Sequence, residues 1–219
     1  MAHLLRHDGR LVWTPADDVS AALVLDPWSW VWAPRPDTGV LEGEPIATRA
    51  AVRWLHRNKQ CRQVPVGVVG PRDPDGPTRA TALALGRSLG DLGLSVLCGG
   101  KTGVMEAVAQ GVKETGGTTI GIVPDNEWAA ANRFIDIPLA TGLGPARNVI
   151  VARASYALVA VGGQYGTITE VAYGLHFNRP VFGLSGAPDI DGVRHMESVD
   201  KVVDALAPII LRLPREVGL

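Results

Sequence analysis

Short runs rich in valine and isoleucine alternate, from Pro65 onward, with longer segments that have helical periodicity. This alternation is typical of strands that pair in parallel and are joined by crossover helices. It predicts an α/β fold with a doubly wound parallel sheet flanked by helices. The expected strands are 66–69, 94–98, 118–123, 134–137, 156–161 and 180–184, and the expected helices are 78–92, 102–115, 145–155, 167–178 and 198–211.

The N-terminal part of the chain has a different pattern. It contains two β-like pieces, 10–14 and 29–33, among several prolines, followed by a helical segment at 46–58. Five of the six tryptophans precede residue 55, whereas 21 of the 26 glycines lie between residues 67 and 186. We therefore expect a small Trp-rich appendage of unknown role at 1–62 and a second domain at 63–219. Two interpretations of the tryptophans stay open: packing against a sheet edge or a partner subunit, or a ligand lid or docking surface.

Composition excludes several classes of protein. The chain has 219 residues, with 21 Lys and Arg against 22 Asp and Glu, so its charge gives no reason to expect a nucleic-acid polymer as partner. The two cysteines and five histidines show no metal-ligand spacing, and we expect no metal. No stretch approaches the roughly 20 apolar residues of a membrane span, and the charged start does not resemble a signal peptide. These features predict a soluble, cytoplasmic protein.

Three expected loops after strands, 70–72, 98–103 and 162–167, are rich in glycine. In an open parallel sheet, ligands bind beyond the carboxyl ends of the strands, where helix N-termini direct backbone N–H groups outward. Glycine lets such a loop approach a phosphate closely, because it has no Cβ. The loops predict a phosphate site with these candidate residues: Gly70, Gly99, Gly100, Lys101, Thr102, Gly103, Gly162, Gly163, Gln164, Tyr165, Gly166 and Thr167.

Several of the candidates also have an ordinary structural explanation. The second loop matches neither the dinucleotide fingerprint nor the GxxxxGK[ST] phosphate loop, and Lys101 is as readily a solvated cation as a phosphate ligand. Cys98 is expected to be a small core residue rather than a nucleophile. Glu106 either stabilises the start of its helix or contacts the ligand. Tyr165 either stacks on a base or packs against its loop.

Two longer strings are more specific than the single loops. Residues 98–124 read CGGKTGVMEAVAQGVKETGGTTIGIVP, and residues 161–170 read VGGQYGTITE, with Arg147 and Asn148 before the second string. Over about residues 65–186 the chain resembles the Rossmann-like family once described as possible lysine decarboxylases. That family includes the Lonely guy nucleotide phosphoribohydrolases and the molybdenum cofactor carrier proteins. The chain is most similar to the carrier-like branch, which has GGxxGVMEA in the first string.

The resemblance implies a pair of catalytic residues. The hydrolytic members have the signature PGGxGTxxE after an Arg-Lys pair, which places Arg147 and Glu170 at the catalytic positions. The chain departs from that signature at three positions. Asn148 stands in place of the lysine, Gly162 in place of the proline, and Gln164 in place of the second glycine. The last departure puts a side chain into the loop that a phosphate would approach.

A hydrolase of this kind would cleave the N-glycosidic bond of a nucleoside 5′-monophosphate through an oxocarbenium-like transition state. The resemblance implies that Glu170 stabilises the positive charge and activates water, while Arg147 orients the nucleotide or Glu170. Residues 167–170 also read as a capping box, with Thr167 as the N-cap and Glu170 at N3. This structural explanation of Glu170 stays open beside the catalytic one.

Two functions are expected for residues 63–219. The first is binding of a nucleotide-like small molecule, with hydrolysis of nucleoside 5′-monophosphates as the corresponding reaction. The alternative is a non-catalytic carrier or sensor of a phosphorylated cofactor such as molybdopterin. The resemblance also implies a homodimer or a higher homo-oligomer, and neither function requires a cofactor of the protein's own.

Overall fold

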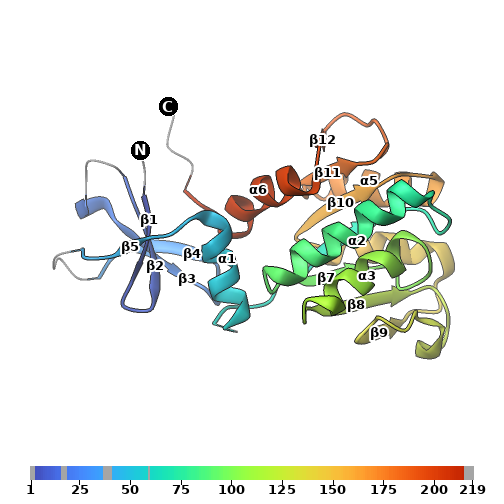
Figure 1. The fold of residues 1–219 in the computed structure, drawn as a ribbon, viewed down its shortest axis with the longest axis horizontal. Helices are drawn as coiled ribbons and strands as arrows, with labels where there is room; N and C mark the ends of the chain where they lie inside the picture. Colours follow the sequence, from blue (N-terminus) through green and yellow to red (C-terminus); the bar gives the residue numbers. More distant parts are fainter. Residues whose placement is uncertain (1–2, 16–18, 37–40, 59, 215–219) are drawn as a thin grey trace. The chain divides into compact units, whose positions relative to one another are not determined.

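The computed structural model describes residues 3–15, 19–36, 41–58 and 60–214 (Figure 1). The chain divides into two compact units, and each unit has its own sheet. The first unit is Met1–Arg62 with Asp204–Leu219, and the second is Gln63–Val203. The boundary at Asp204 falls inside the last helix, α6 (Val199–Ile210).

The second unit is built on a seven-stranded sheet in which every neighbouring pair is parallel. Its order is β12-β11-β10-β6-β7-β8-β9, so the chain first builds outward from β6 to β9 and then continues on the other side of β6. This confirms the doubly wound α/β fold. The strands are β6 (Val66–Val69), β7 (Ser95–Cys98), β8 (Thr118–Val123), β9 (Ile137–Ala140), β10 (Ala157–Val161), β11 (Val181–Leu184) and β12 (Val193–His195).

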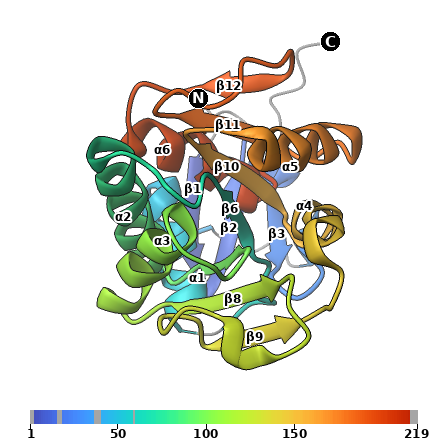
Figure 2. The ribbon, with the colours of Figure 1, turned by 90° about the vertical axis from the view of Figure 1, so that its right-hand side faces the viewer.

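Helices cover both faces of this sheet. Figure 2 shows α2 (Gly76–Asp91) and α3 (Val104–Glu114) on one side of the strands, and α4 (Asn148–Ala154) and α5 (Tyr165–His176) on the other. Asp75 caps α2, because its carboxylate accepts the N–H of Thr78 at 2.8 Å. Two 3₁₀ turns, η2 (Trp128–Ala130) and η3 (Gly144–Arg147), lie in the connections around β9. None of the helices in the described residues is both long enough and apolar enough to cross a membrane.

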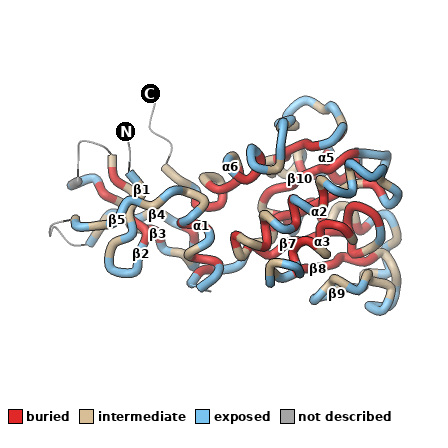
Figure 3. Tube along the Cα trace, viewed as in Figure 1, coloured by how far each residue is buried: buried red, intermediate tan, exposed pale blue. Residues whose placement is uncertain are grey.

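The core of the second unit lies in its central strands. Every residue of β6, β7, β10 and β11 is buried, as the red segments of Figure 3 show. Leu158 of β10, Val171 of α5 and Val181 of β11 belong to one apolar cluster. Burying a side chain of this size stabilises the fold by about 1.5–3 kcal/mol. Strands with helices on both faces are apolar at every position, which is why their runs were recognisable in the sequence.

Three elements of the second unit differ from the sequence-based expectation. Strand β9 is Ile137–Ala140 rather than 134–137, because Asp136 turns back to accept hydrogen bonds from the N–H and hydroxyl of Thr119. The expected helix at 145–155 divides into η3 and α4. Strand β12 was not expected, since it is a three-residue edge strand with two exposed polar residues.

The first unit contains a five-stranded antiparallel sheet with the order β4-β3-β2-β1-β5, a fuller structure than the two expected β-like pieces. Asp8 and Gly9, both with positive φ, form the two-residue turn between its first two strands. The elements are β1 (His3–His7), β2 (Arg10–Thr14), η1 (Val19–Ala21), β3 (Leu23–Asp26), β4 (Val31–Pro34), β5 (Glu44–Pro45) and helix α1 (Thr48–Arg57).

Two tryptophans of the first unit are fixed by hydrogen bonds. Trp30 is buried, donates its indole N–H to the carbonyl of Arg62 at 3.1 Å, and stacks on His56 with ring centroids 5.6 Å apart. Trp32 donates its indole N–H to the carbonyl of Leu211 at 2.8 Å. Trp28, in contrast, is 57% exposed. The tryptophans therefore contribute to packing within the unit, with Trp28 as the exposed one among these three.

Candidate functional site

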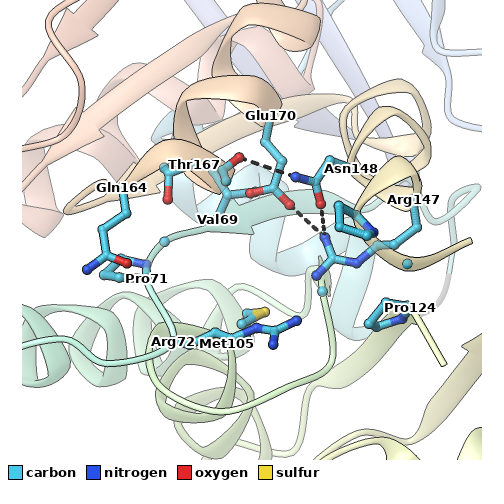
Figure 4. A pocket seen from close by; sticks show the side chains of 15 residues that line it. Val69, Pro71, Arg72, Met105, Pro124, Arg147, Asn148, Gln164, Thr167 and Glu170 are labelled. Carbon is cyan, nitrogen blue, oxygen red and sulfur yellow. Dashed lines mark hydrogen bonds and ion pairs between the residues drawn. The ribbon is translucent and has the colours of Figure 1, made fainter.

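The site lies at the carboxyl ends of the strands, where the strand order of the second unit reverses. Strands β6 and β10 are neighbours there, but their following loops lead in opposite directions along the sheet. Such a reversal opens a crevice beyond the strands, which is where open α/β sheets bind ligands. A cavity of about 420 Å³ occupies this place, within the usual size range of a small-molecule site. It is lined by Val69, Gly70, Pro71, Arg72, Gly99, Met105, Pro124, Gly144, Pro145, Arg147, Asn148, Gln164, Gly166, Thr167 and Glu170 (Figure 4).

A buried ion pair forms one wall of the cavity. Nη1 of Arg147, at the end of η3, donates to Oε1 of Glu170 in α5 at 2.8 Å, and both side chains are less than a tenth exposed. The same Nη1 donates to Oδ1 of Asn148 at 2.6 Å, and Asn148 in turn donates to Oγ1 of Thr169 at 2.9 Å. Figure 4 shows Arg147, Asn148 and Glu170 converging at this wall. The two predicted catalytic residues are thus in direct contact.

Glu170 is not part of a capping box, so that interpretation is wrong. Helix α5 begins two residues earlier than expected, at Tyr165, with the extended residue Gln164 as its N-cap and no side-chain cap bond. The first helical hydrogen bond runs from the N–H of Ile168 to the carbonyl of Gln164. Glu170 therefore lies beyond the first turn, and its carboxylate bonds to Arg147 rather than to a backbone N–H of its own helix.

The electrostatics of Glu170 are those of a desolvated carboxyl. Burial raises its pKa from the ordinary value of 4.5 to about 7, and the charge and hydrogen bond of Arg147 offset only part of this increase. The carboxyl consequently exchanges its proton near neutral pH. A group with such a pKa can act as an acid or a base in a reaction, or change the charge of a binding site within a narrow pH range.

Two glycines make room for the site. A Cβ on Gly99 would lie 2.2 Å from Nη2 of Arg147, so any larger residue there would displace the guanidinium. Gly103 has a φ of +74°, and a Cβ on it would lie 2.4 Å from the carbonyl oxygen of Arg72. Glycine at this second position allows the start of α3 to pack closely against the loop that follows β6.

The structure brings part of the predicted site together. Only some of the residues that the sequence predicted to bind the ligand line the cavity. Those that line it, with the catalytic pair, are Gly70, Gly99, Arg147, Gln164, Gly166, Thr167 and Glu170. The predicted residues that do not line it are Gly100, Lys101, Thr102, Gly103, Glu106, Gly162, Gly163 and Tyr165.

Some of these other residues have clear structural positions. The ammonium group of Lys101 donates to Asp125 and to the carbonyl of Ala130, both at 2.9 Å, and so holds the connection after β8. Tyr165 is 89% exposed at the first residue of α5. Cys98 is buried, as expected for a core residue, and burial raises the pKa of its thiol to about 11.

Sequence reasoning missed several lining residues. Arg72 stands in the first glycine loop, and a cation next to such a loop was a signal that could have identified it. Asn148 was noted only as a departure from the hydrolase signature. Met105 and Pro124 lie within the string at 98–124 but were not singled out in it, and they line the cavity with Pro145 only because separate segments fold together. Among the residues that the structure describes, no group of three or more His, Cys, Asp or Glu side chains is placed to bind a metal.

Comparisons with known proteins agree with this architecture. A protein of Archaeoglobus fulgidus, described only as uncharacterized, is 39% identical over 139 residues, which are 64% of this chain and 91% of that protein. The molybdenum cofactor binding protein of Rippkaea orientalis is 32% identical, with a TM-score of 0.65 over 68% of this chain and 98% of that one. The Moco carrier protein of Chlamydomonas reinhardtii is 35% identical, with a TM-score of 0.64 over 69% of this chain and 100% of that one.

A family model covers nearly the same part of the chain. It matches residues 63–208, which include the whole parallel sheet and every residue that lines the cavity. On this match, and on the solved structures at 32% and 35% identity, the chain belongs to the SLOG cluster4 family.

Proposed function

We propose that the cavity binds a small phosphorylated ligand, either a nucleotide or a phosphorylated cofactor such as molybdopterin, and that the protein serves as its carrier. The observation that carries this proposal is the state of Arg147. Nη1 makes the hydrogen bonds of its guanidinium to the described residues, whereas Nη2 makes none of them and Nε is buried without a partner. A buried donor without a partner costs free energy. An anionic ligand in the cavity would supply a partner to Nη2 of this guanidinium.

The start of α5 is suited to the phosphate itself. The N–H groups of Tyr165, Gly166 and Thr167 precede the first helical hydrogen bond, so they are available to an anion at the positive end of the helix dipole. Thr167 is 2% exposed and lines the cavity, yet its hydroxyl makes no hydrogen bond with the described residues. Two of the similar solved structures are described as a molybdenum cofactor binding protein and a Moco carrier protein, which supports a carrier role.

Replacing Thr167 by valine tests the phosphate position. Thr167→Val keeps the shape of the side chain and removes only its hydroxyl, so the fold should be retained. Hydrogen bonds to charged groups contribute about 1.5–3 kcal/mol, and we expect affinity for the bound phosphate ligand to fall by about tenfold or more. Calorimetric titration with nucleoside 5′-monophosphates and with released molybdenum cofactor measures this change.

The matched control is Thr118→Val, at the exposed start of β8 and away from the cavity. It should bind the same ligand with the affinity of the wild type. Equal affinities of the two variants would contradict a phosphate at the start of α5. A wild-type protein that binds none of these ligands would contradict the proposed function as a whole.

Hydrolysis of nucleoside 5′-monophosphates is the second candidate, and the contact between Arg147 and Glu170 favours it. With a pKa of about 7, Glu170 could stabilise an oxocarbenium-like sugar and accept a proton from the attacking water. Arg147 would hold the carboxylate in position. Incubation with each monophosphate, followed by chromatography for free base and ribose 5-phosphate, separates the two candidates. Binding of a monophosphate without release of these products would support the carrier function and contradict the hydrolase function.

We also propose that the protein is a homodimer, with α4 in the interface. Val149, Ile150, Arg153 and Ala154 of α4 line a shallow, mostly apolar hollow. A second copy is the occupant that the resemblance to dimeric family members favours. Sedimentation equilibrium should give twice the mass of the 23.2 kDa chain, and a monomer at micromolar concentration would contradict the proposal.

A further inference from the structure

A second arginine, Arg72, lines the cavity from the loop that follows β6. This strand and β10 are neighbours at the reversal of strand order, so the loop stands beside the start of α5. The side chain of Pro71 lies near Gly162, which belongs to the loop after β10. Figure 4 shows Arg72 across the cavity from Thr167 and Glu170, on the side of Met105. Arg72 and Arg147 therefore reach the cavity from different walls.

The backbone of Arg72 is held firmly. Its carbonyl accepts the hydroxyl of Thr102 at 3.4 Å and lies in close contact with Gly103. The N–H of Val104, the first residue of α3, donates to the carbonyl of Pro71 at 3.1 Å. These contacts attach the loop to the start of α3. They fix where the side chain of Arg72 begins, and they leave its guanidinium unrestrained.

The guanidinium of Arg72 makes no hydrogen bond or ion pair within the described part of the chain. The nearby carboxylate of Asp125 already binds Lys101 at 2.9 Å. That hydrogen bond is the main reason why the pKa of Asp125 is lowered, and the charge of Arg72 contributes less. Around the cavity the charged lining residues are Arg72, Arg147 and Glu170. Because Glu170 pairs with Arg147, the charge of Arg72 has no counterpart in the lining.

We propose that Arg72 is a specificity-determining residue that binds a second anionic group of the ligand, so that the cavity selects diphosphates and doubly anionic cofactors over monophosphates. This inference rests on the proposed function, since it assumes a first phosphate at the start of α5. An arginine fork suits this task, because it binds phosphate or carboxylate oxygens through two parallel hydrogen bonds. Its position on a fixed loop across the cavity sets where the second group must lie.

Substitution of Arg72 by glutamine tests the inference. The ligands are the adenosine, guanosine, cytidine and uridine 5′-monophosphates and the matching diphosphates, titrated by calorimetry. The wild type should bind the diphosphate of its preferred base at least about tenfold more tightly than the monophosphate, and Arg72→Gln should lose most of this ratio. Arg72 is exposed, so the variant should fold, which circular dichroism checks.

The control is Arg79→Gln, which removes the same charge from an exposed position of α2 outside the cavity. It should keep the wild-type ratio. Three results would each overturn the role of Arg72. They are an equal loss of affinity for monophosphates and diphosphates in Arg72→Gln, a wild type that does not prefer diphosphates, and the same loss of preference in Arg79→Gln. A wild type that binds neither the eight nucleotides nor released molybdenum cofactor would instead contradict the proposed function.

Discussion

Asn148 shows how one residue shapes the chemistry of the site. Its amide accepts from Arg147 at 2.6 Å and donates to Thr169 at 2.9 Å, so it joins the end of η3 to α5. A lysine at this position, as in the hydrolase signature, would bring a second cation to Glu170. With asparagine at position 148, Arg147 is the cation that pairs with Glu170. Burial already disfavours the charged form of this carboxyl. A buried ion pair of this kind contributes little net stability, which favours a role in ligand binding over a purely structural one.

The raised pKa of Glu170 predicts a pH dependence of stability. Because its pKa is about 7 in the folded protein and 4.5 without burial, the folded state holds the proton over that range and the unfolded state releases it. The contribution of this carboxyl to stability is therefore complete below about pH 4.5 and is lost as pH rises to about 7. We expect the free energy of unfolding of the wild type to fall, relative to Glu170→Gln, between these pH values.

Urea unfolding of both proteins at a series of pH values, followed by circular dichroism, measures this difference. The comparison with the glutamine variant removes the contributions of all other titrating groups. A difference that grows with pH would show that the attraction of Arg147 outweighs burial, and it would contradict the raised pKa.

Among the elements, those buried on both faces were the ones that the sequence predicted well. Strands β6, β7, β10 and β11 appear as continuous apolar runs, because helices cover both sides of each. Elements at the edges carry no such signal, and β9 and β12 were displaced or missed. The start of α5 was misjudged because Thr167 resembles a cap, whereas the chain already becomes helical at Tyr165. The glycine loops predicted the place of the cavity, and Arg72 was missed because no local pattern tells which side chain of a loop faces a cavity.

Helix α1 carries a buried histidine whose protonation should destabilise the first unit. Nδ1 of His56 lies 3.0 Å from the carbonyl of Val52, and Nε2 is buried without a partner among the described residues. Burial lowers the pKa of His56 below its ordinary value of 6.5. The unfolded chain therefore binds a proton near pH 6.5 that the folded unit does not accept. Stability from this group is complete above that pH and declines as the pH falls below about 6.5.

Tryptophan fluorescence reports this transition, because five of the six tryptophans lie in the first 62 residues and Trp30 stacks on His56. Urea midpoints should decrease from pH 7.5 to pH 5.5 in the wild type, and much less in His56→Gln. The control His3→Gln, at an exposed position of β1, should follow the wild type. The same pH dependence in His56→Gln as in the wild type would contradict this role of His56.

At the scale of the whole molecule, the family match distinguishes the two units. The family match at residues 63–208 covers the parallel sheet and the cavity, and the similar solved structures cover 68–69% of the chain. The antiparallel sheet of the first unit lies outside that match. The proposed phosphate site, with its buried Arg147 and Glu170 and the free N–H groups of α5, belongs entirely to the second unit. Ligand binding should therefore depend on residues of that unit.

A crystal structure of the protein with its tightest-binding phosphorylated ligand tests the proposed site most directly. We expect the phosphate to lie within hydrogen-bond distance of the N–H groups of residues 165–167, with the hydroxyl of Thr167 as a further donor. The guanidinium of Arg147 should contact the ligand through Nη2. A phosphate bound elsewhere, with the cavity beside Arg147 and Glu170 filled only by water, would contradict the proposed function.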